Sequence, residues 1–213
     1  YIVYGNDEIW ITELNEDLTA PKKDGLHRLL VSDHKNPELG YEGSHIQKIN
    51  GYYYIFLVHS LRDRWMRTEA CFYSDSLEGE FTGGDVLCDD RGYCGQGVAQ
   101  GGIVDTPDGK WYAMLFQDSG AVGRIPILLP VTWKDHFPVF GQNGHVPEEI
   151  EVHSTRPGYI YQPLVGSDDF CNGLLPRWQF NHDPDPRYYH LDALQGTYTI
   201  TTREVCTELT QAV

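Results

Sequence analysis

Apolar residues along this chain come in short segments that are rich in Tyr, Val, Ile and Trp and are separated by Gly, Asp, Asn and Pro. Residues 9–14 and 69–74 alternate apolar and polar positions, and helical periodicity is almost absent. Alternation with a period of two is the pattern of a strand that buries one face. The pattern therefore predicts an all-β protein.

One combination of turn and strand recurs along the chain. An Asn-Gly turn precedes an aromatic strand at 52–56, an Asp-Gly turn precedes a similar strand at 111–116, and residues 1–5 fit the same strand without its turn. The three units follow one another at intervals of 52 and 59 positions. Such a period is typical of the blades of a β-propeller, each a four-stranded sheet around an axis. Two ordinary hairpins are the alternative.

The residue composition and pattern along the chain divide it into three regions. Residues 1–141 carry the recurring units, and residues 142–173 are loop-like and rich in Pro, Glu, Asp and Gly, which favours an interdomain linker. Residues 174–213 look like a second β unit with strands at 178–184 and 198–202. About 40 residues are too few for a stable sandwich alone, so we expect this unit to be incomplete and the chain to be cut at both ends.

Charge and cysteine content narrow the class of partner. The formal net charge is −15, from 31 acidic and 16 basic residues, which argues against nucleic acid and anionic membrane surfaces as partners. No apolar run approaches the roughly 18 residues needed to span a bilayer. The cysteines show no CxxC pattern, which indicates reduced structural thiols, disfavours zinc and favours a cytoplasmic location, unless an upstream signal peptide reverses this. They are Cys71, Cys88, Cys94, Cys171 and Cys206.

The most informative local pattern is a carboxylate followed by glycine just before a strand, at Glu42 and Gly43. Glycine has no Cβ, so it lets a bulky ligand approach the backbone closely. Flanking strands would hold the carboxylate in a fixed direction, which a general acid requires. The alternative is a Glu at a strand end that faces solvent.

Several blocks together resemble glycoside hydrolase family 43, which contains β-xylosidases and α-L-arabinofuranosidases. The resemblance covers most of the chain, in the family's order, and rests on residues 41–45, 51–54, 97–102, 123–133 and 178–182. It implies part of a five-bladed β-propeller followed by the start of a β-sandwich. It also implies hydrolysis with inversion, in which an acid protonates the leaving oxygen and a base activates water.

The resemblance assigns one catalytic residue in this chain. Glu42 matches the family's general acid, whereas the base and a third, pKa-tuning Asp are expected upstream of Tyr1. Asp7, Asp17 and Asp105 lie in turn-like or strand-edge settings and are interpreted as surface residues.

Three further residues are candidates for binding substrate. Arg124 follows a glycine in a block similar to the family's segment near the sugar pocket, and its alternative role is a structural ion pair with Asp118 or Asp135. Gln100 offers an amide that both donates to and accepts from hydroxyls. Phe116, with Trp65 and Trp111, is a candidate platform for a pyranose face, although aromatic residues in propeller strands are more often core.

A metal site is not assigned. Many relatives hold a divalent cation, usually calcium, near the axis through a His just before the Gly-Arg pair, and Ser119 stands where that His is expected. No cofactor is therefore expected to be required, with a calcium ion as the open alternative.

The leading functional hypothesis is an exo-acting glycosidase that removes xylose from the non-reducing ends of xylo-oligosaccharides. Arabinofuranoside cleavage as the main activity, a non-catalytic carbohydrate-binding propeller and a protein-binding scaffold are the alternatives. The expected partner is a xylo-oligosaccharide or arabinoxylan-derived substrate, and a homo-oligomer stays open. An open ring would leave sheet faces unpacked, so we expect the isolated chain to be poorly soluble or inactive.

Overall fold

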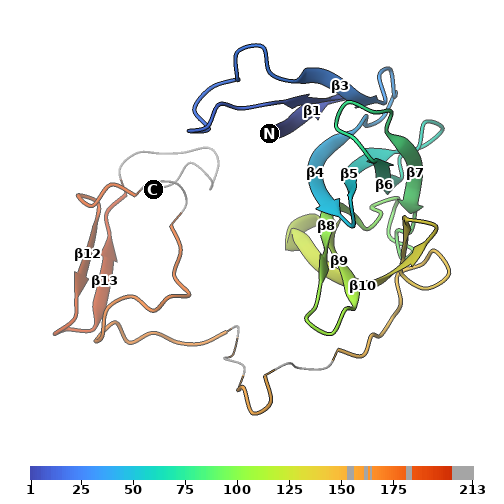
Figure 1. The fold of residues 1–213 in the computed structure, drawn as a ribbon. Coiled ribbons are helices and arrows are strands. Elements are labelled where there is room, and N and C mark those ends of the chain that lie inside the picture. Colours follow the sequence, from blue (N-terminus) through green and yellow to red (C-terminus); the bar gives the residue numbers. More distant parts are fainter. Residues whose placement is uncertain (153–155, 161–162, 164, 181–183, 203–213) are drawn as a thin grey trace. The chain divides into compact units, whose positions relative to one another are not determined.

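The fold is known from a computed structural model (Figure 1), which describes residues 1–152, 156–160, 163, 165–180 and 184–202. These residues form two compact units, 1–152 and 153–213, whose boundary falls inside the predicted linker. The described elements are strands, apart from one 3-10 helix, η1 (Gly120–Val122), so the all-β prediction is confirmed. Within the described ranges, no helix is both long enough and apolar enough to cross a bilayer.

The first unit contains three antiparallel sheets. The first has the order β1-β2-β3, the second β4-β5-β6-β7 and the third β11-β10-β9-β8. The strands of the first sheet are β1 (Ile2–Asn6), β2 (Glu8–Thr12) and β3 (His27–Ser32). Those of the second are β4 (Glu42–Ile49), β5 (Tyr52–Ser60), β6 (Arg67–Ser74) and β7 (Thr82–Leu87). Those of the third are β8 (Ala99–Asp105), β9 (Trp111–Asp118), β10 (Arg124–Lys134) and β11 (Phe137–Phe140).

The sheets repeat one plan with an offset. β1, β5 and β9 carry the recurring aromatic pattern, and β1 lies beside β4 as β5 lies beside β8. The three-stranded sheet therefore matches the last three strands of each four-stranded sheet (Figure 1). Each four-stranded sheet has one additional strand, β4 or β8, which precedes these three in the chain. Successive four-stranded meanders packed on one another are the blades of a β-propeller, as the period predicted. The first unit is part of such a propeller.

Two hydrophobic cores hold the blades together, and β5 contributes to both. Leu57 belongs to the core between the first and second sheets, whereas Phe56 belongs to the core between the second and third. Neighbouring residues of a strand point to opposite faces, so a strand buried on both sides needs an almost continuous apolar run. Residues 52–58 provide it. Burial of each such large side chain contributes roughly 1.5–3 kcal/mol.

The second unit is small and corrects one prediction. β12 (Tyr189–Asp192) pairs with β13 (Thr197–Ile200), the latter close to the strand predicted at 198–202. A strand at 178–184 is wrong over residues 178–180, where the Trp178 N–H donates to the Leu175 carbonyl at 3.0 Å and forms a turn. Its indole N–H donates to Asp168 at 2.8 Å, so this side chain is used to fix a loop. Residues 181–183 lie outside the described part.

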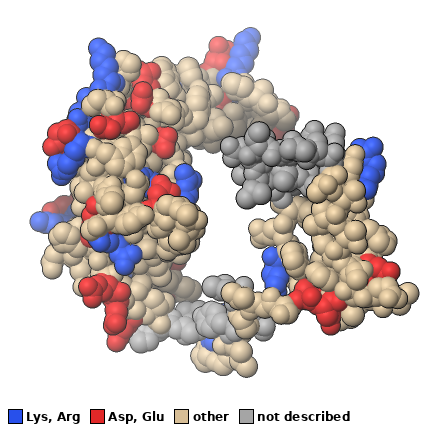
Figure 2. Space-filling view, turned by 180° about the vertical axis from the view of Figure 1, so that it is seen from behind, with Lys and Arg blue, Asp and Glu red and all other residues tan. Residues whose placement is uncertain are grey.

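Charged side chains on the face shown in Figure 2 are mixed in sign. Basic and acidic side chains lie singly or in small groups among uncharged residues. Among the described residues of that face, no broad basic surface of the kind that follows a phosphate backbone is visible. Of the five cysteines, the four that the structure describes are free thiols, and Cys206 lies outside the described part.

Candidate active site

Glu42 is the first residue of β4 and stands at a β-bulge. It pairs with Val58 of β5, and the register then shifts before His45 pairs with Phe56, so two residues oppose one. Gly43 sits in the bulge with φ 62°, a left-handed conformation that glycine adopts without a steric penalty. Bulges redirect side chains next to active sites, and this one sets the direction of the partly buried Glu42.

Gln100 occupies the equivalent bulge of the next blade. In β8, Ala99 pairs with Phe116 before the register shifts, and Gln100 has φ 71° although it is not a glycine. A Cβ placed on Gly43 would lie 2.5 Å from the Gln100 Nε2 atom. The Gln100 side chain therefore fills the space that the missing Cβ of Gly43 leaves, directly beside Glu42.

Glu69 of β6 is a buried carboxyl that sequence reasoning missed. It pairs with Val58, so Glu42, Val58 and Glu69 form one row on the same face of the second sheet. Its Oε2 accepts the Gln100 backbone N–H at 2.6 Å, while its Oε1 is buried without a hydrogen-bond partner. Complete burial holds the pKa of Glu69 well above its usual range, so the protonated form is favoured.

Arg67 brings a positive charge to the same face of β6. Its side chain is 5% exposed, and its guanidinium donates to Asp118 Oδ2 at 2.8 Å. Burial lowers the pKa of Arg67, and the nearby carboxylates of Asp118 and Glu42 oppose that effect. Glu42 therefore lies within electrostatic reach of a fixed cation.

Arg124 and Phe116 complete the cluster. The Arg124 Nε donates to Asp118 Oδ1 at 3.2 Å, so the ion pair with Asp118, one of the alternatives, is present. Its side chain is still 66% exposed, which leaves N–H groups accessible. The guanidinium carbons of Arg67 and Arg124 each lie 4.7 Å from the centroid of the Phe116 ring. Phe116 thus supports two cations by cation–π contacts, and its contact with sugar stays a prediction.

The two other aromatic candidates, Trp111 and Trp65, lie in different environments. Trp111 packs edge-on against Trp133, with ring centroids 5.4 Å apart, and belongs to the core region. Trp65 lies between β5 and β6 and is 40% exposed. Trp111 is therefore core, whereas Trp65 is accessible.

The described residues do not display an evident metal centre. Among them, no three His, Cys, Asp or Glu side chains gather as metal ligands. The Ser119 hydroxyl donates to the Gln117 carbonyl at 3.4 Å, and the neighbouring Asp118 is engaged by two arginines.

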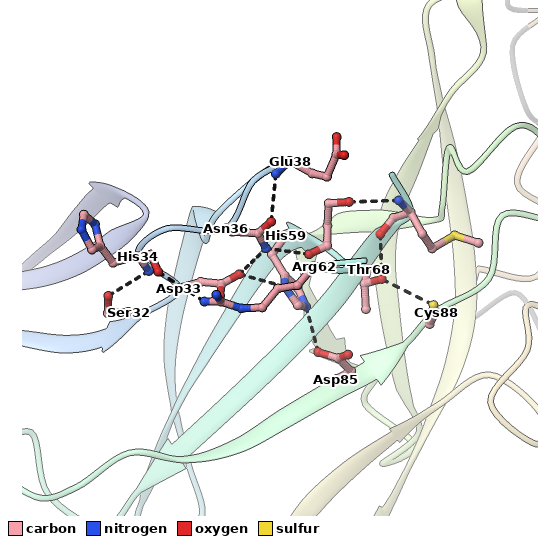
Figure 3. A network of polar contacts seen from close by, with 12 residues as sticks. Ser32, Asp33, His34, Asn36, Glu38, His59, Arg62, Thr68, Asp85 and Cys88 are labelled. Carbon is pink, nitrogen blue, oxygen red and sulfur yellow. Dashed lines mark hydrogen bonds and ion pairs between the residues drawn. The ribbon is translucent and has the colours of Figure 1, made fainter. Parts of the chain in front are cut away.

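A second polar cluster, between the first and second blades, supports the segment that leads to Glu42 (Figure 3). His59 is buried between two carboxylates, with Nδ1 3.2 Å from Asp33 Oδ2 and Nε2 2.8 Å from Asp85 Oδ1. Arg62 also donates to Asp33. Burial by itself lowers the pKa of His59, but the hydrogen bonds and charges of Asp85 and Asp33 outweigh it and raise that pKa. Both ring nitrogens then act as donors.

Tyr41 connects this cluster to the site. Its ring lies 5.0 Å from the His59 ring and 5.4 Å from that of Phe72, centroid to centroid. Burial, with the charges of Asp33 and Asp85, raises the pKa of Tyr41 to about 12. Since Tyr41 directly precedes Glu42, this packing fixes the backbone from which Glu42 projects. His59 therefore acts as a structural residue.

One sequence signal marks the two missed residues. Arg67 and Glu69 are two positions apart in an otherwise apolar or neutral strand, so they share a face with Cys71. Charged residues on the face of a strand that also carries core residues indicate a polar seam inside the protein. The alternation of residues 69–74 by itself predicts only a strand that buries one face.

The chain is similar to known proteins. The family model "Glycosyl hydrolases family 43" matches residues 1–138. The chain is 28% identical over 189 residues to a beta-xylosidase of Formosa agariphila. The aligned region covers 78% of this chain and 32% of that protein. The chain is 26% identical over 171 residues to the non-reducing end alpha-L-arabinofuranosidase BoGH43B of Bacteroides ovatus, covering 73% and 32%.

A solved structure extends the similarity to the whole chain. A bifunctional GH43-CE protein of Bacteroides eggerthii is 40% identical, with a TM-score of 0.79, and the match covers 100% of this chain and 27% of that one. The chain spans about a third of the length of the curated relatives that it matches.

Proposed function

Because the chain belongs to glycosyl hydrolases family 43, we propose that it is a segment of a longer glycosidase in which Glu42 is the general acid. The enzyme removes xylose from the non-reducing ends of xylo-oligosaccharides with inversion. The similarity to a beta-xylosidase supports the substrate class. One observation carries the role of Glu42, namely its place at the bulge, with Gln100 beside it and the charge of Arg67 within reach.

The main catalytic group that this chain must supply is a correctly positioned proton donor. In an inverting glycosidase the acid protonates the leaving oxygen while a separate carboxylate activates water on the opposite face of the sugar. Glu42 supplies the first step, and the base comes from outside the residues assigned here. Gln100 and the exposed N–H groups of Arg124 bind sugar hydroxyls, and Phe116 holds Arg124 in place. Proton transfer of this kind requires no cofactor, and a structural calcium ion stays the alternative.

The test compares leaving groups in Glu42→Gln in the full-length enzyme. A sugar leaving group needs protonation, whereas a nitrophenolate departs without it, so the variant should lose about 10²–10⁴-fold in kcat/KM on xylobiose. It should lose far less on an activated aryl xyloside. Glu16→Gln, at an exposed position, is the matched control and should behave as the parent.

Three other results would redirect the proposal. Equal losses of the Glu42 variant on both substrates would show that Glu42 is not the acid. Faster turnover of aryl arabinofuranosides than of xylosides by the parent would favour the second candidate, an arabinofuranosidase, which the similarity to BoGH43B supports. Binding of xylo-oligosaccharide without hydrolysis by the parent would indicate a carbohydrate-binding propeller.

A further inference from the structure

A hollow of about 500 Å³ opens beside the Asp118 side chain. Its walls come from three connections, β5 to β6, β7 to β8 and β9 to β10. Because the strands are antiparallel, these connections lie at the end of the sheets where β4 and β8 begin, which is the end that carries Glu42 and Gln100. The lining residues are Trp65, Tyr93, Cys94, Gln96, Asp118 and Gly120, and we call this hollow the Trp65 pocket.

Two aromatic side chains of the pocket are exposed to solvent. Trp65 is 40% exposed and Tyr93 is 44% exposed. Within the described residues, neither ring packs against another aromatic ring. A Cβ on Gly95 would lie 2.5 Å from the Trp65 carbonyl and 3.1 Å from its indole, so only glycine lets the β7–β8 connection run this close to Trp65. Large rings kept at a surface by close backbone packing are suited to contact with a ligand.

The polar groups of the pocket are held in place by buried contacts. Gln117 Nε2 donates to the Asp90 and Gln96 carbonyls at 2.7 and 2.8 Å, which anchors the β7–β8 connection to β9. The Gln96 side-chain amide, in contrast, has no hydrogen-bond partner among the described residues. Asp118 is fixed by Arg67 and Arg124 and remains 36% exposed. The pocket therefore combines aromatic faces with a free amide and an oriented carboxylate.

We propose that the Trp65 pocket is a subsite for the leaving-group sugar of the substrate, a neutral pentopyranose. The proposal rests on the proposed function, since the departing sugar carries the oxygen that Glu42 protonates and so lies on the Glu42 side. Arg67 links the two, because it donates to Asp118 and lies within electrostatic reach of Glu42. The C–H face of the sugar packs on Trp65 and Tyr93, and its hydroxyls donate to Asp118 and exchange hydrogen bonds with Gln96. The volume is within the usual range for ligand pockets.

The kinetic test uses two substrates that differ only in the leaving group, xylobiose and β-D-xylosyl fluoride, with the full-length enzyme. Fluoride as a leaving group has no sugar ring that could occupy the Trp65 pocket. Trp65→Ala should therefore lower kcat/KM about 10-fold on xylobiose and leave kcat/KM on xylosyl fluoride unchanged. Trp65→Phe should recover most of the loss. Tyr93→Ala should act like Trp65→Ala, and Tyr4→Ala, a tyrosine of similar exposure on β1, should change neither substrate.

A binding measurement keeps this inference separate from the proposed reaction. Calorimetric titration of Glu42→Gln with xylose and with xylobiose gives the gain in affinity from the second sugar. That gain should disappear when Trp65→Ala is added, whether or not the protein hydrolyses either sugar. An unchanged gain, or equal kinetic losses of Trp65→Ala and Trp65→Phe on both substrates, would overturn the subsite. Absence of hydrolysis in the parent would overturn only the proposed function.

Discussion

At the scale of single residues, the two charged side chains of β6 that face the third blade, Arg67 and Glu69, differ in how their polar atoms are paired. Arg67 is paired with Asp118 and covered by Phe116, whereas Glu69 has one carboxyl oxygen bonded and one without a partner. Removing an ionised carboxylate from water costs more than protonating it, so such a group keeps its proton. The role of Glu69 is then to hold the Gln100 N–H, and through it the bulge beside Glu42.

Glu69→Gln should weaken the pH dependence of stability. A carboxyl whose folded-state pKa is raised stabilises the fold fully below its unfolded pKa, near 4.5, and that stabilisation is lost as the pH rises toward the folded-state pKa. The unfolding free energy of the parent should therefore fall as the pH rises above about 4.5, and that of the variant should fall less. Urea titrations at a series of pH values measure this.

The control for Glu69→Gln is Glu69→Leu, which fills the space without an acceptor. It leaves the Gln100 N–H buried and unpaired, so its unfolding free energy should be about 1–3 kcal/mol below that of Glu69→Gln at every pH. If the pH curves of Glu69→Gln and the parent run parallel, Glu69 is ionised in the folded protein and its assigned role is wrong.

At the scale of elements, the first strands of the second and third sheets share one structural feature, a β-bulge. β4 and β8 both carry a bulge one step after their first residue, with Gly43 in one and Gln100 in the other at left-handed φ. The first bulge needs glycine because Gln100 occupies the adjacent space. The second bulge tolerates a side chain because the Glu69 carboxyl holds its backbone. The site thus depends on the two blades meeting at these bulges.

Gly43→Ala should therefore reduce both stability and activity. A left-handed alanine costs roughly 1–2 kcal/mol, and the new methyl also displaces the Gln100 side chain from its place beside Glu42. Gly51→Ala is the matched control, because Gly51 also has positive φ but has no atom within 4 Å of an added Cβ. Unfolding free energy and kcat/KM on xylobiose are measured for both. Activity kept by Gly43→Ala at the level of Gly51→Ala would refute the contact.

At the scale of the whole molecule, the features that sequence reasoning predicted are the local and periodic ones. The alternating strands and the recurring aromatic unit predicted the blades. The Glu-Gly pair drew attention to Glu42, but the bulge there and the Gln100 side chain that fills the space beside Gly43 were not predicted. The contacts of Glu69 and Arg67 were not predictable in this way, since they join residues 31 and 51 positions apart across a seam between blades. The strand expected at 178–184 was wrong over 178–180 because a local turn and the Trp178–Asp168 hydrogen bond compete with pairing.

The edge of the first sheet determines how the 213-residue chain behaves on its own. β5 and β9 are each paired on both sides, whereas β1 is an edge strand among the described residues, with Ile2 and Tyr4 nearly half exposed. An exposed apolar edge is a template for pairing with another chain. The isolated chain should therefore associate as its concentration rises, and Ile2→Lys with Tyr4→Lys should suppress this, because two charges disfavour edge-to-edge pairing. Light scattering during size-exclusion chromatography measures the mass, and Leu18→Lys, in an exposed turn, is the control. A monomeric parent at high concentration, or equal suppression by the control, would show that β1 does not mediate association.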